Sequence, residues 1–261
     1  MAYLFAFLQT DGSYRKGGQN KGSITVELSA VDVGILQQFQ RTVPYKSFIR
    51  FRSRRTNFAE EHATAIWSLH SGAARRALEA LGLPSGRKSA IVRPPDAPVS
   101  EPDYVRGLVD ADGSVGFTAR GYPFISFTTL SPAMNAYFSD RVREITGVRR
   151  TVNPNKRDGV YNLLLTSESA VEFTRWLYYE DCLALERKRA RAQKVAQWTR
   201  PEGMRRRVSR RRWTPEEDAV VLESAIKEAA RILGRTEKSV ALRHRRLRQA
   251  DTGEEVRTSL S

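Results

Sequence analysis

The sequence predicts an α+β protein built of two pseudo-symmetric αββαββα repeats and a small all-α C-terminal segment. Three observations carry this prediction. Helical apolar runs alternate with segments whose apolar residues recur at every second position. An apolar run that ends in Asp-Gly-Ser occurs twice, at residues 4–13 and 105–114. A dense basic run after residue 204 then precedes a short helix-rich end.

The first repeat, residues 1–90, opens with the apolar helix that ends at Asp11. A glycine-rich hairpin tip follows, and its basic residues are candidates for DNA contact: Arg15, Lys16 and Lys21. The remaining elements follow from periodicity and capping residues. They are a strand at 23–28, a helix at 31–42, strands at 47–54 and 63–69, and a helix at 73–81.

The strand at 47–54 separates apolar from basic residues. Ile49 and Phe51 point to one face, which we expect to be the core side. The other face carries Arg50, Arg52 and Arg54. Three arginines on one strand face fit a sheet laid along a DNA groove, and the alternative is a solvated face.

A proline-rich connector at 91–102 leads to the second repeat, residues 103–196. Its first helix is capped by Ser100 and ends at Asp112, and Gly113 is expected in the left-handed conformation that stops a helix. Strands are expected at 114–117, 123–128, 149–152 and 161–166, and helices at 132–146, 167–179 and 183–196. The basic residues of the third strand and of the turn after it are further candidates for DNA contact: Arg149, Arg150, Lys156 and Arg157.

The two Asp-Gly pairs predict metal chemistry. Asp11 and Asp112 are 101 positions apart, one in each copy of the duplicated segment. A carboxylate at a helix C-terminus adds to the negative end of the dipole and is unfavourable unless a cation joins it. Carboxylates and main-chain carbonyls are the hard oxygen ligands that Mg²⁺ accepts.

Residues 105–113 resemble the nine-residue signature of the LAGLIDADG homing endonucleases, and residues 4–12 are a weaker copy. In the weaker copy Ala6 replaces the family glycine, Gln9 the first acid and Thr10 the second alanine, while Asp11 is kept. The resemblance implies a DNA-binding saddle that cuts both strands and leaves short 3′ overhangs. It implies a single-chain monomer that uses Mg²⁺ (or Mn²⁺).

The same resemblance implies roles for particular residues. Asp11 and Asp112 would be catalytic metal ligands, helped by the backbone carbonyls of Thr10 and Ala111. Lys88 would be the basic residue near a metal. The small residues Ala6 and Gly107 would allow the two signature helices to pack closely.

The C-terminal part divides into a basic arm at 197–212, a helical segment at 213–249 and a tail at 250–261. The segment resembles a Myb/SANT-type helix-turn-helix in Trp213, the acidic first turn after it and an arginine-rich last helix at 237–248. A basic helical hairpin without sequence specificity is the alternative. The expected DNA contacts are Arg205, Arg206 and Arg207 in the arm and Arg243, Arg245 and Arg246 in the last helix.

Composition agrees with a nucleic-acid partner. The formal net charge of +15 and the pI near 10.3 favour a nucleic acid over an anionic membrane as partner, against the alternative of a merely soluble basic protein. The resemblance implies that this nucleic acid is double-stranded DNA. Cys182 is the only cysteine, which excludes a disulfide framework. We expect a cytoplasmic protein encoded by a prokaryote or a phage. Two other functions stay open on the same fold: an intron maturase, and a DNA-binding regulator that has lost cleavage.

Overall fold

The computed structural model describes residues 1–19, 21–56, 59–204 and 213–258. It divides into two compact units, Met1–Glu202 and Gly203–Ser261. Each unit has a hydrophobic core of its own. Within the described ranges no helix is both long and apolar enough to cross a membrane.

The first repeat of the larger unit has the predicted order of elements. These are α1 (Ala2–Thr10), β1 (Ser13–Arg15), β2 (Ser23–Ser29), the 3-10 turn η1 (Ala30–Asp32), α2 (Val33–Thr42), β3 (Ser47–Thr56), β4 (Ala59–Leu69) and α3 (Gly72–Ala80). The strands form an antiparallel sheet in the order β1-β2-β4-β3. Ile24 and Val26 are buried on one face of it, as their alternation predicts.

The second repeat follows the same plan with one strand fewer. It consists of α4 (Glu101–Asp112), β5 (Gly113–Phe117), β6 (Pro123–Thr129), α5 (Pro132–Thr146), β7 (Tyr161–Thr166), α6 (Glu168–Leu177) and α7 (Glu186–Ala196). Its described strands pair antiparallel in the order β5-β6-β7. The α+β fold class is therefore confirmed.

The strand predicted at 149–152 is wrong. Gly147 ends α5 in the left-handed conformation, and the segment after it runs without regular structure to β7. The segment closes on itself instead of extending the sheet, because the Asn155 N–H donates to the Val160 carbonyl at 2.9 Å and the Gly159 N–H to the Asn155 carbonyl at 2.8 Å. Pro154 has no N–H to give to a ladder. Arg149 and Arg150 therefore lie in a loop.

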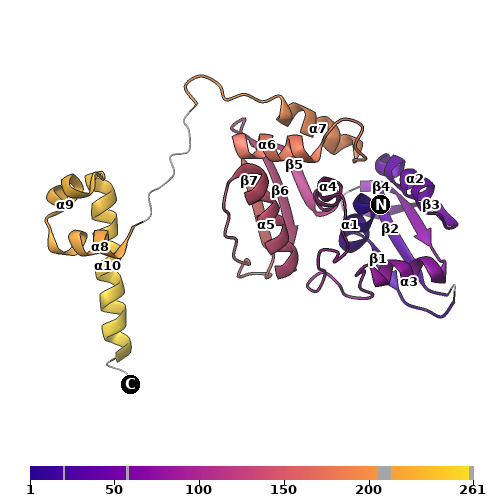
Figure 1. The fold of residues 1–261 in the computed structure, drawn as a ribbon, viewed down its shortest axis with the longest axis horizontal. Helices are drawn as coiled ribbons and strands as arrows, with labels where there is room; N and C mark the ends of the chain where they lie inside the picture. The colour runs from indigo at the N-terminus through magenta and orange to yellow at the C-terminus, as the bar shows by residue number, and fades with distance from the viewer. Residues whose placement is uncertain (20, 57–58, 205–212, 259–261) are drawn as a thin grey trace. The chain divides into compact units, whose positions relative to one another are not determined.

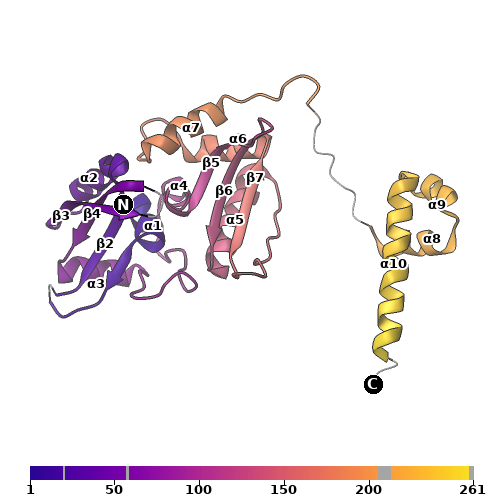
Figure 2. The ribbon, with the colours of Figure 1, turned by 180° about the vertical axis from the view of Figure 1, so that it is seen from behind.

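The helices α1 and α4 pack side by side between the two sheets (Figure 1 and, from behind, Figure 2). Nearly all of α1 is buried, from Tyr3 to Gln9, which explains why its sequence is apolar all round. The aromatic rings of Tyr3, Phe7, Phe39 and Trp67 form a chain of contacts from α1 through α2 to β4. The hydrophobic core of the larger unit is one cluster that includes buried residues of both repeats.

Phe51 departs from the prediction. It lies on the core-side face of β3, yet its side chain is 67% exposed, whereas Ile49 packs against the core. The reason is length: ten residues of strand span about 33 Å, and the ten-residue helix α2 that covers the sheet spans about 15 Å. The outer part of β3 extends beyond its helical cover.

The described part of the smaller unit contains three helices around a small core. They are α8 (Pro215–Glu223), α9 (Ile226–Leu233) and α10 (Glu237–Thr258). Val221, Ala229 and Val240 are buried between them. The last helix continues beyond Arg248, where it was expected to end, because neither a proline nor a capping glycine follows directly.

Candidate functional site

The candidate site lies where α1 and α4 end. Asp11 follows the last residue of α1, and Asp112 is the last residue of α4. Both are exposed, although the helices that they end are buried as far as Gln9 and Asp110. Two helices that pack along their length and end at the same place bring two carboxylates, one from each repeat, to one surface of the larger unit.

The close approach of the two helices depends on Ala6 and Gly107. A Cβ atom at Gly107 would lie 2.5 Å from the Tyr3 carbonyl oxygen and 2.7 Å from the Ala6 Cβ. Neither distance is tolerated between non-bonded atoms. The structure thus brings together the two small residues that the resemblance paired.

Gly113 has a different role from the one expected. Its backbone is extended, with φ −118° and ψ −174°, so the prediction of a left-handed stop is wrong. Glycine is needed because a Cβ atom there would lie 2.4 Å from the Ser126 carbonyl oxygen and 2.7 Å from that of Val109. Gly12 stands equally close to its own helix, with the Leu8 carbonyl oxygen at 2.5 Å. At both acids the chain turns from helix to strand in a space that admits no side chain.

Two equivalent hydrogen bonds join the two helices. The residues that form them are as far apart in the sequence as the two acids. The Tyr3 hydroxyl of α1 donates to Asp110 of α4 at 2.7 Å, and the Tyr104 hydroxyl of α4 donates to Gln9 of α1. Tyr3 and Tyr104, like Gln9 and Asp110, are 101 positions apart. The matching contacts show a pseudo-twofold relation between the repeats at this helix pair.

Asp110, the first acid of the better signature copy, is a structural residue. Its carboxylate is buried and accepts from the Tyr3 and Tyr178 hydroxyls and from the Leu185 N–H, at 2.6–2.8 Å. Burial raises its pKa. At the equivalent position the Gln9 amide accepts from Tyr104 and donates to the Arg93 carbonyl at 2.8 Å. A glutamine can therefore replace the acid here, because the position serves as a buried acceptor between the helices.

Each helix C-terminus is capped by a buried lysine. The Lys88 ammonium donates to the carbonyls of Gln9 at 2.8 Å and Thr10 at 2.5 Å. The Lys188 ammonium, from the first turn of α7, donates to the carbonyls of Val109, Asp110 and Gly113 at 2.6–2.8 Å. A cation at this end satisfies orphan carbonyls and opposes the dipole. The Thr10 carbonyl, expected as a metal ligand, thus already accepts one hydrogen bond and keeps a second lone pair.

Sequence reasoning missed Lys188. It lies in a run of basic residues in which nothing local distinguishes it from its neighbours. The signal was spacing: Lys188 follows Lys88 by 100 positions, nearly the offset between the two acids. Both lysines bear the marks of a functional site, since burial lowers the pKa of Lys88 and lowers that of Lys188 to about 8.

The two acids and two lysines form one electrostatic cluster. Burial and then the Asp11 carboxylate raise the pKa of Asp112 to about 6, against the pull of Lys88 and Lys188. Burial also raises the pKa of Asp11, opposed mainly by the Lys188 ammonium. Two carboxylates that repel each other at an open surface are a fit for a divalent cation.

The protein itself supplies few ligands. The part of the chain that the structure describes holds no group of three or more histidine, cysteine, aspartate or glutamate side chains able to share a metal. The oxygen donors are the two carboxylates and nearby main-chain carbonyls, with Ala111 beside Asp112. Such a set suits Mg²⁺, which usually keeps several waters and takes one or two carboxylates plus phosphate oxygens.

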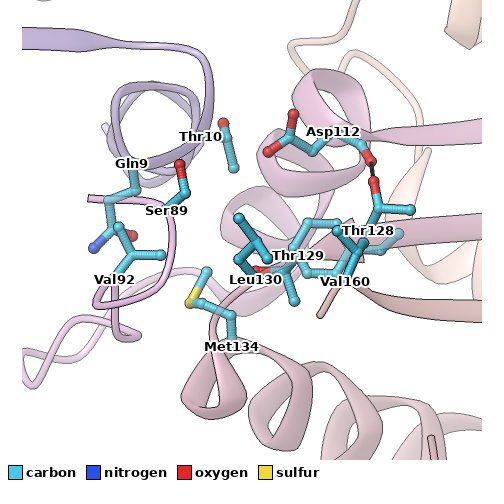
Figure 3. A pocket seen from close by; sticks show the side chains of 11 residues that line it. Gln9, Thr10, Ser89, Val92, Asp112, Thr128, Thr129, Leu130, Met134 and Val160 are labelled. Carbon is cyan, nitrogen blue, oxygen red and sulfur yellow. Dashed lines mark hydrogen bonds between the residues drawn. The ribbon is translucent and has the colours of Figure 1, made fainter. Parts of the chain in front are cut away.

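A pocket of about 190 Å³ opens beside Asp112 (Figure 3). Thr10 and Ser89 line it from the first repeat, and Asp112 and Thr128 from the second. The Thr128 hydroxyl donates to the Asp112 carbonyl at 2.8 Å and so ties the end of α4 to β6. Met134 and Phe127 form an apolar side. The pocket joins elements of both repeats next to the acid.

The predicted DNA contacts fall into several places. Arg50 and Arg52 are exposed on β3 and Arg15 on β1, while the side chain of Arg54 lies outside the described residues. The hairpin tip exposes Lys16, which pairs with Glu79, and Lys21. In the loop before β7, Arg149, Lys156 and Arg157 are exposed and Arg150 is half-buried. Arg205, Arg206 and Arg207 lie outside the described residues.

In the smaller unit Arg243 has a partner inside the fold. Its guanidinium forms an ion pair with Asp218, with contacts as short as 2.5 Å, and lies 5.8 Å from the Trp213 ring centroid. Arg235 lies over the same ring at 4.0 Å and pairs with Glu217 at 2.7 Å. These contacts hold the helices together, so of the three arginines predicted in the last helix only Arg245 and Arg246 are exposed.

Comparison with known proteins found no matching family model and no matching curated protein. Among solved structures, the chain is similar to the meganuclease I-SmaMI bound to uncleavable DNA, with a TM-score of 0.49 and 11% identity over 75% of this chain and 88% of that one. It is also similar to the N-terminal LAGLIDADG domain of DUF199/WhiA, with a TM-score of 0.47 and 11% identity over 70% and 82% of the two chains. A third is the LAGLIDADG homing endonuclease I-GzeII in complex with its DNA target, with a TM-score of 0.48 and 9% identity over 75% and 88%. Similarity at this level carries no activity from one protein to another.

Proposed function

We propose that this protein is a site-specific, divalent-metal-dependent endonuclease that cuts both strands of double-stranded DNA. The observation that carries the proposal is the duplicated site: Asp11 and Asp112 end paired helices, and each helix end is capped by its own lysine. The two strands of a duplex run in opposite directions, and a protein with twofold symmetry presents equivalent groups to both. One acid for each strand is what double-strand cleavage requires.

Asp11 and Asp112 would hold the metal ions, with the carbonyls of Thr10 and Ala111 beside them. A bound divalent metal activates water and stabilises the leaving oxygen of a phosphodiester. The protein contributes carboxylates that are exposed and repel each other, so a cation and a phosphate can reach them and the cation relieves the repulsion. Mg²⁺ or Mn²⁺ suits these oxygen donors.

Lys88 and Lys188 would contribute both to the geometry and to the charge of the site. By donating to the last carbonyls of α1 and α4 they fix the direction in which each chain leaves its helix toward the acid. Their charges also offset the acids before metal binds and attract phosphate. Burial lowers the pKa of Lys188 to about 8, so its positive charge decreases in mildly alkaline solution.

The two sheets, the basic arm and the smaller unit would bind the DNA. The two sheets would form the saddle over the duplex, with Arg50 and Arg52 toward the groove. The basic arm at 197–212 and the smaller unit would add phosphate and base contacts, the unit acting as a helix-turn-helix of the Myb/SANT kind. We propose that the protein works as a monomer, since one chain supplies both acids.

The test is selection by cleavage. A supercoiled plasmid library with a randomised insert is incubated with the full-length protein in Mg²⁺, and linear products are sequenced. We expect cutting at one recurrent sequence, with none in EDTA and none by the Asp11→Asn variant. Sequence-specific binding without linear product would instead favour the regulator that has lost cleavage. Preference for structured RNA over duplex DNA would favour the maturase.

A further inference from the structure

The open faces of the two sheets differ in chemistry. In each sheet alternate residues pack on the core, and the residues between them point to the other face. In the first sheet that other face exposes Arg15, Arg50 and Arg52, with Glu27 beside them. The strands β5, β6 and β7 of the second sheet contain no charged residue at all.

The strand registers show which residues lie beside one another on the open face of each sheet. In the first sheet Ile66 of β4 pairs with Glu27 on one side and Arg50 on the other. An acid and an arginine therefore share one row, two strand spacings or about 10 Å apart. The Thr64 hydroxyl donates to the Glu27 carboxylate at 2.8 Å and holds it on this face. Arginine reads the guanine edge, and a carboxylate accepts from the cytosine amino group.

The second sheet has neutral rows. Ser126 pairs with Ser114 and Leu164, and Asn162 pairs with Thr128. Asn162 is exposed and Leu164 is 47% exposed, on the face opposite the buried Leu163 and Leu165. An asparagine amide reads adenine, and an apolar side chain contacts the thymine methyl group.

The strands of the second sheet carry no positive charge, but the loops next to them do. Arg120 is exposed in the turn between β5 and β6, and Arg149, Lys156 and Arg157 are exposed in the segment before β7. Charges at the ends of strands can contact DNA phosphates. Such contacts position a protein on the duplex but do not distinguish one base sequence from another. Base reading in this half therefore falls to the neutral strand face.

We propose that the two halves of the DNA target differ in base composition. The half under the first sheet is rich in G·C pairs, and the half under the second sheet is rich in A·T pairs. This inference rests on the proposed function. It goes beyond it by assigning the specificity-determining residues: Glu27, Arg50 and Arg52 for one half, Asn162 and Leu164 for the other.

The experiment is a binding selection from a random duplex library with the full-length protein in Ca²⁺. The recovered sites are expected to have one G·C-rich and one A·T-rich half. Arg52→Ala should lower preference at one or two positions of the G·C-rich half by about 5- to 150-fold. Leu164→Ala should lower preference about 5-fold, and only in the A·T-rich half. The matched control is Leu81→Ala, which shortens another exposed leucine, at the end of α3.

Two results would overturn the inference. Recovered sites with G·C-rich halves on both sides would do so, as would a Leu164→Ala variant that reads every position like the parent. Either result leaves the proposed endonuclease intact, because the library is still sorted by sequence. If no sequence is enriched and plasmid libraries are not cut, the proposed function itself fails. Melting curves of the three variants establish that each is folded.

Discussion

Replacing Asp112 by asparagine should stabilise the protein while it destroys the site. In the metal-free protein, burial and the neighbouring Asp11 carboxylate raise the pKa of Asp112 from its ordinary value of 3.8 to about 6. The folded protein thus binds this proton more tightly than the unfolded chain does, and the charged carboxylate costs stability. The cost is fully present above pH 6 and is lost as the pH falls from about 6 toward 4.

The magnitude follows from the size of the pKa change. A difference of about two pH units corresponds to about 3 kcal/mol if it is fully realised. Asp112 is exposed at the surface although protein atoms surround much of it, so solvent screens the repulsion. We therefore expect a gain of about 1 kcal/mol in the free energy of unfolding at pH 7.5.

Urea unfolding in EDTA at several pH values measures this gain. The stability of the parent protein relative to that of Asp112→Asn should fall as the pH rises from about 4 to about 6. A divalent cation at one hundred times its dissociation constant should stabilise the parent by about 2.7 kcal/mol and the variant far less. Asp140→Asn on α5 is the control, since it removes an exposed charge with only a weak 3.6 Å pair to Arg143. A variant less stable than the parent in EDTA, or equally stabilised by Mg²⁺, would refute the reasoning.

Three further predictions address helix packing, the capping lysine and the smaller unit. Gly107→Ala should cost about 1–3 kcal/mol in urea unfolding, because its Cβ has no space between α1 and α4. Gly34→Ala, in the open on α2, should gain about 0.5–1 kcal/mol. Lys188→Met should lower cleavage and leave three carbonyls uncapped, while Lys194→Met on the exposed side of α7 should change neither cleavage nor stability. Removing residues 203–261 should weaken DNA binding and flatten its salt dependence, because the slope follows the number of phosphates neutralised.

Each of these has an outcome that contradicts it. Equal stability of the Gly107 and Gly34 variants would mean that the helices do not meet at Gly107. Full plasmid cleavage by Lys188→Met would remove that lysine from the site. A truncated protein with an unchanged salt slope would show that the smaller unit does not contact DNA.

The sequence by itself determined most of the fold. Period-two alternation and capping signals placed the helices and nearly all strands, because burial on one face of an element leaves a local pattern. The prediction of a strand at 149–152 was wrong because Pro154 and the turn after it keep this segment out of the sheet. The prediction that Phe51 faces the core was wrong about its burial, because alternation shows which face a residue takes but not how far the covering helix reaches.

The sequence also placed Asp11 and Asp112 at the ends of two equivalent helices, since duplication makes an equivalent residue visible by its spacing. The tertiary structure alone decided what surrounds them. Lys188 caps carbonyls about 75–79 positions earlier in the chain, and nothing near it in sequence indicates this. Gln9 and Asp110 serve as acceptors between the helices only because Tyr104 and Tyr3 face them across the pair. Such contacts depend on which elements meet, and that is set by packing of the whole unit and not by local periodicity.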